Sequence, residues 1–480
     1  MADLVDISPI DPERFRSVLP RDRFEAFEHG AREARELLEG RVVWNVNSTA
    51  LGGGVVELVR PLVAYARGAG VDARWIVVEG TPEFFTVTKR IHNRLHGARG
   101  DGGPLDDAAR GIYEHVLVEN AAQFAGWIRQ GDVVILHDPQ TAGLVQAMRA
   151  AGAAVVWRCH VGLDHPNDLA REAWAFLRPY LAGAEAYVFS RESFAWEGLA
   201  RERIVVIPPS IDVFAPKNVD LDPNTVRAVL SESGIVDDPG APAPAAFERA
   251  DGTPGRIERR AVLIQDQPLG PDVPVVLQVS RWDALKDPIG VIRGFAEQVP
   301  PSTGAHLVYA APVAEAVTDD PEGVRVLRES IAVREALPEE SRSRIHLATL
   351  PLDDPEENAV MVNALQRHSR VVVQKSLAEG FGLTVAEAMW KSRPVVASRI
   401  GGIADQIVHG DTGVLLDDPE DLAAYGAAVT GLLTDPSRAE RMGRRARERV
   451  LQRFVSVRSL LDYLAVVRQV LAARSPSATV

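Results

Sequence analysis

The chain has 480 residues, of which 46% are hydrophobic and 25% charged, a composition typical of a globular protein long enough for two domains. Its formal net charge of −13 argues against nucleic acid as a partner, because nucleic acids recruit basic surfaces. Cys159 is the single cysteine, so no disulfide can form within the chain. The sequence shows neither a signal-peptide pattern nor an apolar run of about 20 residues, which predicts a cytoplasmic protein without a membrane partner.

The first half of the chain has the pattern of a doubly wound α/β domain. Residues 1–40 predict an N-terminal extension with a charged helix at about Arg21–Glu39. From Arg41 on, short β-branched runs alternate with helical stretches, and we assign residues 41–213 to a first domain with a parallel sheet. The strands expected there are Val42–Val46, Ala73–Val78, Val133–His137, Val155–His160, Ala186–Ser190 and Ile204–Ile207.

A second series of strands and helices follows the linker-like segment Pro208–Asn218 and predicts a second domain over residues 214–453. Within it, residues 231–274 are rich in Pro, Gly, Asp and Ala, and they predict an irregular insertion. The chain from Ser437 to its end is expected to be helical. The expected strands are Val275–Val279, His306–Ala310, Arg344–Ala348, Val371–Gln374, Val395–Ser398 and Val414–Leu416.

A glycine-rich segment, Asn47–Val55 (NSTALGGGV), follows the first expected strand and precedes a helix. Gly52, Gly53 and Gly54 would let a ligand approach the backbone closely. The segment matches neither the dinucleotide fingerprint nor the Walker phosphate loop. It predicts a loop that faces a ligand, with a flexible surface turn as the alternative.

Two polar clusters stand where neighbouring strands of the first domain end. One is His137-Asp138-Pro139-Gln140, and the other is Arg158-Cys159-His160. Binding sites of α/β proteins form at the carboxyl ends of parallel strands. A single histidine in such a place is more often structural, but two polar clusters in adjacent units favour a binding site.

A basic pair follows the first expected strand of the second domain, in the segment QVSRWDALKDP. The guanidinium of Arg281 can hold a phosphate through two parallel hydrogen bonds, and Lys286 adds a compact positive charge. Together they could neutralise a pyrophosphate without a divalent metal. The alternative is that both side chains are only solvated surface charges.

The stretch Gln374–Arg399 has the order strand, glycine turn, helix, strand. Glu379 lies in the turn, and Glu387 lies eight residues later, inside the helix. The unpaired N–H groups at the helix start, from Gly382 on, form a favourable anion site. An anion site between two carboxylates suits a ligand with phosphate in its middle and hydroxyls at both ends, such as a nucleotide sugar.

The glutamates in this E-x7-E stretch, with the basic pair before them, resemble those of retaining family 4 glycosyltransferases of the GT-B type. The runs VVWNVNSTALGGGVVELV, EGTPEFFTVTKRIHNRLHG, HDPQ and RCH resemble the trehalose glycosyltransferring synthases over nearly the whole first domain. These enzymes join glucose from a nucleotide-diphosphate glucose to free glucose. The resemblance implies an α/β GT-B fold of two Rossmann-like domains that face a cleft. It also implies that a C-terminal helix within residues 454–480 crosses back to the first domain.

The same resemblance implies roles for the residues that match the motifs. Arg281 and Lys286 would neutralise the leaving pyrophosphate, with no metal or other cofactor. Glu387 would bind the ribose hydroxyls, and Glu379 would bind the 3- and 4-hydroxyls of the donor glucose. His160 would touch the transferred glucose near its 6-hydroxyl. The other donor-binding positions are Gly53, Gly54, Phe381, Gly382, Leu383 and Thr384, and Asp138 would bind the acceptor.

Three other functions stay open from the residues alone. A trehalose phosphorylase-like enzyme would use inorganic phosphate in place of the nucleotide. Another family 4 transferase would share the donor motifs and use a different acceptor. A nucleotide-sugar binding protein would keep the site without turnover. The nucleotide base, the direction of the reaction and the oligomeric state, for which a homodimer is one expectation, are also open.

Overall fold

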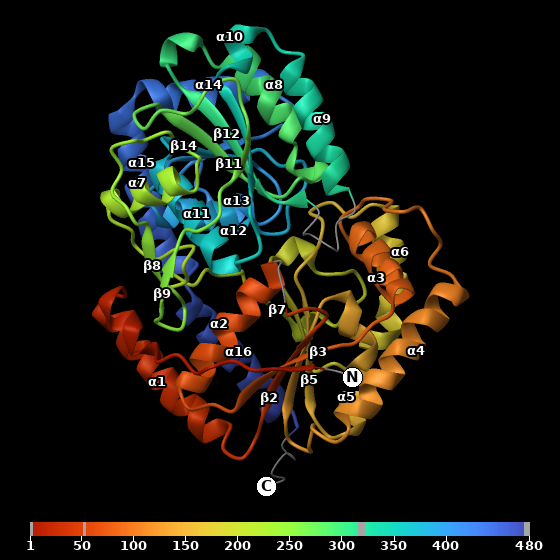
Figure 1. Ribbon diagram of the computed structural model, residues 1–480. Helices are drawn as coiled ribbons and strands as arrows, with labels where there is room; N and C mark the ends of the chain where they lie inside the picture. The colour runs from red at the N-terminus through yellow and green to blue at the C-terminus, as the bar shows by residue number, and fades with distance from the viewer. Residues whose placement is uncertain (1–2, 51–53, 315–321, 475–480) are drawn as a thin grey trace. The chain divides into compact units, whose positions relative to one another are not determined.

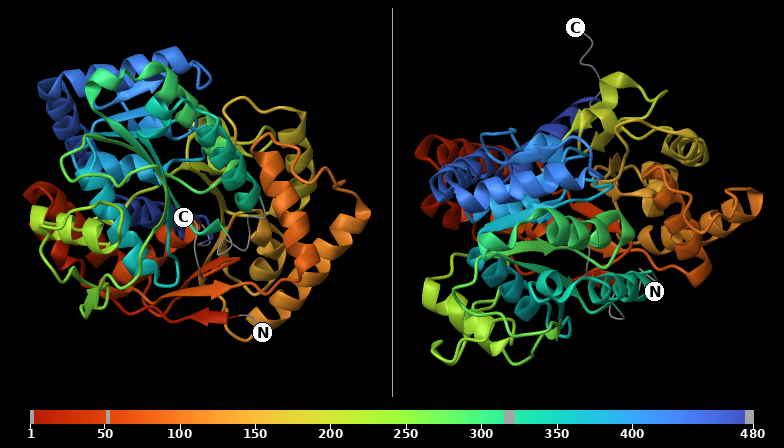
Figure 2. Two further views of the ribbon diagram at one scale, coloured as in Figure 1. Left: turned by 45° about the horizontal axis from the view of Figure 1, so that its top comes forward. Right: turned by 90° about the horizontal axis from the view of Figure 1, so that it is seen from above.

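The computed structural model describes residues 3–50, 54–314 and 322–474. The chain divides into two compact units, the first Met1–Ser210 with Phe454–Val480 and the second Ile211–Arg453. Each unit contains a seven-stranded sheet with helices on both of its faces (Figures 1 and 2). The predicted α/β class with two Rossmann-like domains is therefore confirmed.

The sheet of the first unit has the strand order β1-β3-β2-β4-β5-β6-β7. Strand β1 pairs antiparallel with β3 at one edge, and the other pairings are parallel. The strands are β1 (Asp3–Val5), β2 (Val43–Asn47), β3 (Ala73–Val77), β4 (Val133–His137), β5 (Ala154–Cys159), β6 (Ala186–Phe189) and β7 (Ile204–Val206). The helices are α1 (Arg21–Leu37), α2 (Gly54–Gly68), α3 (Pro82–Leu95), α4 (Asp107–Phe124), α5 (Val145–Ala150), α6 (Asp168–Leu181) and α16 (Ser456–Ala472).

Successive residues along the strands of this sheet point to opposite faces, so they contribute side chains to two separate cores. Trp44, Val46 and Trp157 belong to the core that α3, α4, α5 and α6 cover. Val43 and Val156 belong to the opposite core, which α2 and α16 cover. Helix α16 thus packs in the first unit although it follows the second unit in the sequence, so the predicted return of the C-terminal helix is confirmed.

The sheet of the second unit has the order β10-β13-β12-β11-β14-β15-β16. Only β10 pairs antiparallel, at the edge beside β13. The strands are β8 (Ala246–Glu248), β9 (Pro254–Arg256), β10 (Val262–Ile264), β11 (Val275–Val279), β12 (His306–Pro312), β13 (Ile345–Leu350), β14 (Val371–Gln374), β15 (Val395–Ser398) and β16 (Val414–Leu416). The helices are α7 (Pro223–Glu232), α8 (Pro288–Gln298), α9 (Gly323–Glu335), α10 (Glu339–Arg342), α11 (Pro355–His368), α12 (Leu383–Trp390), α13 (Ile403–Gln406), α14 (Leu422–Thr434) and α15 (Pro436–Arg453).

Two cores also flank the second sheet. Val276 and Val373 face α8, α9 and α14, whereas Leu277 and Val308 face α7, α11 and part of the segment 231–274. Among the described residues, no helix of either unit is both long and apolar enough to cross a membrane.

Both sheets reverse their strand order at one point. From β2 the first sheet adds β3 on one side and β4 on the other, and from β11 the second sheet adds β12 on one side and β14 on the other. In open α/β sheets, ligands bind at the carboxyl ends of the strands beside such a reversal point. The reversal points therefore lie where the sequence places its HDPQ cluster, its basic pair and its E-x7-E turn.

The segment 231–274 is more regular than its composition predicts. It contains the two-stranded sheet of β8 and β9, and β10 extends the main sheet next to β13. Phe247, Ile257 and Leu269 are buried in the core that α11 covers. The prediction of irregular structure was therefore wrong for these strands. Each strand has only three residues, too few for an alternating pattern to show in the sequence.

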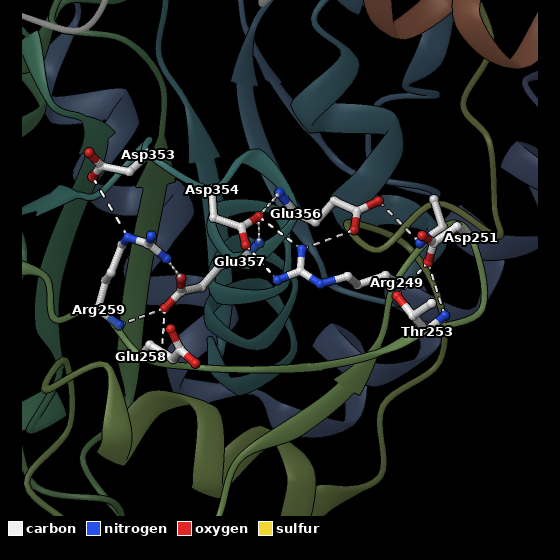
Figure 3. Close-up of polar contacts among 10 residues, drawn as sticks. Arg249, Asp251, Thr253, Glu258, Arg259, Asp353, Asp354, Glu356 and Glu357 are labelled. Atoms are coloured by element: carbon white, nitrogen blue, oxygen red, sulfur yellow. Dashed lines mark hydrogen bonds and ion pairs between the residues drawn. The ribbon is translucent and has the colours of Figure 1, made fainter. Parts of the chain in front are cut away.

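Ion pairs fasten this segment to the start of α11 (Figure 3). The side chain of Glu357 is only 1% exposed and accepts hydrogen bonds from the backbone N–H groups of Glu258 and Arg259, each at 2.7 Å. Arg259 Nη1 also donates to this carboxylate at 2.6 Å. Arg249 donates to Asp354 Oδ2 at 2.6 Å and to Glu356 Oε2 at 3.3 Å.

We predict that Glu357→Ala destabilises the second unit by about 2–4 kcal/mol, because it leaves two backbone donors without their acceptor and leaves Arg259 only its more distant partner Asp353. Glu356→Ala is the matched control and should cost less than about 1 kcal/mol, because Arg249 keeps Asp354 and the Ala250 N–H that loses its acceptor is exposed to water. Native-state hydrogen exchange at the backbone amides of β13 measures both values. Equal protection in the two variants would contradict the prediction.

Candidate active site

The turns after β11 and β14 are joined by hydrogen bonds at the reversal point of the second sheet. Gln278 Nε2 donates to the Lys286 carbonyl at 2.7 Å, and Gln278 Oε1 accepts from the Lys375 N–H at 3.1 Å. The Leu377 N–H donates to the Leu285 carbonyl at 2.8 Å. The segment that carries the basic pair and the segment that leads to Glu379 therefore hold fixed positions relative to each other.

A buried ion pair strengthens this connection. Lys375 Nζ donates to Asp287 Oδ2, and Asp287 Oδ1 accepts the N–H of Gly290 at the start of α8. Asp287 has a left-handed backbone with φ of 50°, which an aspartate tolerates better than most residues. The pair fixes the residue directly after Lys286, so the direction of the Lys286 side chain is constrained.

Lys286 and Glu379 form an ion pair with each other. Lys286 Nζ lies 2.7 Å from Glu379 Oε2, and the two side chains are 17% and 14% exposed. Arg281 lies in the same turn, more exposed, with Nη2 at 3.3 Å from Asp283 Oδ2. A diphosphate bound here would compete with Glu379 for Lys286, and sugar hydroxyls could then take the place of the ammonium at the carboxylate.

The start of α12 requires glycine. Gly382 has φ of 81°, and a Cβ there would lie 3.0 Å from Ile403 Cγ1 and 3.3 Å from Glu379 Cγ. The Phe381 carbonyl accepts a hydrogen bond from Gln406 Nε2 at 2.5 Å, so the turn is braced from behind. Leu383 is the first residue of α12. The Thr384 hydroxyl donates to Gln374 Oε1 at 2.8 Å. Thr384 would therefore bind a ligand through its backbone and not through its hydroxyl.

Glu387 lies inside α12 and is almost completely covered, with a side chain 3% exposed. Lys217 Nζ lies 3.7 Å from its Oε1 atom. The carboxylate therefore lies in a positive environment and offers a ligand only a small exposed part.

In the first unit, His137 and His160 form a chain of hydrogen bonds with Asn45. His137 Nε2 lies 3.1 Å from Asn45 Oδ1, and His137 Nδ1 lies 2.9 Å from His160 Nε2. The Asn45 oxygen can only accept, so the proton of His137 is on Nε2 and His160 donates through its own Nε2. His160 Nδ1 is then a lone-pair acceptor. Burial and the charge of Arg158 lower the pKa of His137 to about 3 and hold the pKa of His160 well below its usual range.

Asp138 connects the ends of β4 and β5. Its Oδ1 accepts the His160 N–H at 2.7 Å, and its own N–H donates to the Arg158 carbonyl at 2.7 Å. Burial raises the pKa of Asp138 to about 7, although the hydrogen bond from His160 and the charge of Arg158 act in the opposite direction. Ionising the Asp138 carboxyl group is therefore unfavourable at this position.

A small cavity adjoins these residues. Its space of about 20 Å³ for water-sized molecules is enough for one water. Arg158 is fully buried at its wall, and Arg158 Nη2 donates to Ser190 Oγ at 3.2 Å. The wall also includes His137, His160, Ser210, Ser456 and Tyr463.

The structure brings the predicted residues together in two groups. The second unit gathers Arg281, Lys286, Glu379 and residues 381–387 around the reversal point of its sheet. The first unit gathers Asp138 and His160. Gly54 is the exposed first residue of α2, and the predicted contact at Gly53 lies outside the described residues.

Sequence reasoning missed the residues that support the site. Gln278, Lys375 and Asp287 hold the two turns together, and Ser210 and Ser456 line the small cavity of the first unit. Gln278 lies within β11 and Lys375 directly follows β14, and no local sequence pattern shows that either residue connects the two turns. The serines lie near the end of the first unit and in α16, far from every motif.

Comparison with known proteins defines the class. Residues 356–449 match the family model "Glycosyl transferases group 1", and residues 45–196 match the model "Trehalose synthase, N-terminal domain". The chain is therefore a glycosyltransferase, and the prediction of an enzyme is confirmed.

Two relatives define the family. The chain is 33% identical over 458 residues to the trehalose synthase of Pyrococcus horikoshii, with 95% of each chain covered. It is 34% identical over 460 residues to the trehalose synthase of Rubrobacter xylanophilus, with 95% of this chain and 96% of that one covered. The chain belongs to the trehalose synthase family, as its motifs predicted.

A solved structure supports the fold. The α,α-trehalose-phosphate synthase (UDP-forming) from Burkholderia xenovorans, in complex with glucose-6-phosphate, superposes with a TM-score of 0.64 at 16% identity. The match covers 89% of this chain and 100% of that one. The similarity confirms the predicted GT-B fold.

The raised pKa of Asp138 predicts a stabilising variant, Asp138→Asn. A carboxyl whose folded-state pKa is about 7 contributes stability below its ordinary pKa of 3.8 and loses that contribution as pH rises through 7. The amide cannot ionise and keeps an oxygen for the His160 N–H. The gain in unfolding free energy over the natural protein should therefore grow by about 2 kcal/mol between about pH 5 and pH 8. Urea unfolding at both pH values measures it, and a gain independent of pH would contradict the assignment.

Proposed function

We propose that the protein is a retaining glucosyltransferase that forms α,α-trehalose from a nucleotide-diphosphate glucose and free glucose. The observation that carries this proposal is the meeting of Lys286 and Glu379 beside the start of α12. A positive charge, a helix N-terminus and a carboxylate acceptor converge there, and a sugar attached to a diphosphate needs all three.

The donor would lie across the turns after β11 and β14. Its diphosphate would meet Arg281, Lys286 and the N–H groups at the start of α12, and its ribose would meet Glu387. Its glucose would bond to Glu379 through hydroxyl groups. This arrangement needs no divalent metal or other cofactor, because the two cations and the helix N-terminus supply the positive charge.

The reaction would break the bond between the anomeric carbon and the diphosphate oxygen. The anomeric hydroxyl of the acceptor glucose would form the new bond on the same face and give its proton to the leaving phosphate. Glu379 is held by Lys286, which suits a sugar-binding role better than that of a nucleophile. Catalysis would then consist of positioning and of stabilising the charge on the leaving group.

The acceptor would meet the polar ends of β4 and β5. His160 Nδ1 offers a lone pair, and Asp138 offers a carboxylate next to it. An apolar acceptor would leave such buried groups without partners, at about 1–3 kcal/mol for each. A free sugar is therefore the acceptor that fits.

The direct test is the product. Purified protein is incubated with glucose and, in turn, ADP-, UDP-, GDP- and dTDP-glucose, and products are identified by NMR. We expect a non-reducing disaccharide with an α,α linkage that trehalase cleaves. If the donor is consumed only in the presence of another acceptor, the trehalose assignment is refuted, but the protein is still a glycosyltransferase. Glucose release from trehalose only with inorganic phosphate would favour a phosphorylase.

The basic pair yields a kinetic prediction. Arg281→Ala and Lys286→Ala should each lower kcat/KM by about 10²–10³-fold, equal to roughly 3–4 kcal/mol of transition-state stabilisation. Chelation of divalent metals should leave activity unchanged. Arg325→Ala on α9, a half-exposed pair with Glu329, is the matched control and should keep natural kinetics. Natural kinetics in both test variants would contradict the pyrophosphate assignment.

The two glutamates should act on different parts of the donor. Glu387→Ala should weaken binding of the free nucleoside diphosphate by about tenfold, the loss of one charge-assisted hydrogen bond. Glu379→Gln should keep or strengthen that binding, because Lys286 loses its competing partner, and should still lower transfer. Calorimetry with the free diphosphate and kinetics with the full donor separate the two effects. Equal loss of diphosphate affinity in both variants would refute this division.

A further inference from the structure

Lys391 is a buried cation next to the candidate nucleotide site. It directly follows α12 and is only 2% exposed. Its Nζ atom donates to Asn218 Oδ1 at 3.0 Å, to Gln366 Oε1 at 2.7 Å and to the Glu387 carbonyl at 3.2 Å. All three acceptors are uncharged. A buried ammonium with uncharged acceptors is expensive, which points to a role for its charge.

The charge lies next to Glu387, because the Lys391 ammonium is hydrogen-bonded to the backbone carbonyl of that residue. Lys391, the residue that caps the end of α12, follows Glu387 by four positions, which is about one helical turn. Lys217 Nζ lies 3.7 Å from Glu387 Oε1. Burial lowers the pKa of Lys391, and the negative charge of Glu387 is the largest influence in the opposite direction.

The groups that hold Lys391 also hold Lys217. The Asn218 carbonyl accepts from Trp390 Nε1 at 3.0 Å, so the segment that carries Lys217 is attached to α12. Asn363 Nδ2 of α11 donates to the Pro216 and Val219 carbonyls on either side. The position of both cations is therefore fixed by the same hydrogen-bond network.

Other charged groups near Lys391 are paired with one another. Arg367 of α11 lies 2.9 Å from Asp220, and Arg447 of α15 lies 3.5 Å from the same carboxylate. The two arginines add positive charge, which Asp220 offsets in part. Glu387 is the remaining carboxylate among the groups that act on Lys391.

We propose that Lys391 is a positioning residue for the donor, whose buried charge acts with Lys217 to hold the Glu387 carboxylate ionised and directed at the nucleotide ribose. This inference rests on the proposed function, because it takes Glu387 as the ribose-binding group. A purely structural lysine would fix the segment around Asn218 and leave the charge state of Glu387 unaffected.

The test separates the charge of Lys391 from its packing. Lys391→Gln removes the charge and keeps a side chain that can donate hydrogen bonds. Calorimetry with ADP and UDP should show that the variant binds about tenfold more weakly than the natural protein near pH 6 and within about threefold of it near pH 8.5. Without the positive charge, Glu387 takes up a proton more readily, and this matters only at the lower pH. Lys391→Arg should keep the natural pH profile.

A matched control and a double variant make the test specific. Arg344→Met removes another buried cation of the second unit, whose Nη atoms donate to the Ala305 and Val299 carbonyls. It should lower stability and leave the pH profile of nucleotide binding unchanged. In a Glu387→Gln background, Lys391→Gln should have no further effect on affinity.

Several results would overturn the inference. One is an equal loss of affinity at both pH values, and another is the same loss in the Glu387→Gln background. If Lys391→Gln does not fold, Lys217→Gln must show the pH-dependent weakening, and its absence counts equally against the proposal. If the protein without any substitution binds no nucleoside diphosphate, both the proposed function and this inference are overturned. Normal binding with an unaffected Lys391→Gln variant would overturn this inference alone.

Discussion

The hydrogen bonds between the turns after β11 and β14 are the constraint on which the candidate site depends. Parallel neighbouring strands place both turns at the same edge of the sheet, but they do not fix the turns to each other. Gln278 does so, because its amide bonds to the backbone of Lys286 and of Lys375. The positions of the basic pair, of Glu379 and of the start of α12 all follow from that connection.

Charges in this protein serve two distinct purposes. The pairs of Arg249 and Arg259 with the start of α11 are fully matched and fasten the segment 231–274 (Figure 3). Asp138 and Lys391 are different, because burial disfavours the charged form of each. Asp138 directly follows β4, at the end of a strand where α/β proteins bind ligands, and Lys391 lies next to Glu387. A buried group whose charged form is disfavoured in such a place agrees with a functional role.

The fold was largely predictable from the sequence, whereas the residues that hold the candidate site together were not. Buried β-branched runs gave every parallel strand to within two residues, because those strands are apolar on both faces. The edge strands β1 and β10 have three residues each and carry no such signal. Glycines and charged residues at fixed spacing predicted Glu379, Glu387, Arg281 and Lys286 as site residues, and of these the structure brings Lys286 and Glu379 into contact. Lys375 and Asp287 are 88 positions apart, so only the folded chain shows that they pair.

The proposed function requires that the reversal point of the second sheet binds the donor. A crystal structure of the protein with its preferred nucleoside diphosphate tests it most directly. We expect diphosphate oxygens within hydrogen-bond distance of Arg281, Lys286 and the N–H groups at the start of α12, with the ribose hydroxyls on Glu387. A diphosphate bound elsewhere, with the pair of Lys286 and Glu379 unchanged, would contradict it.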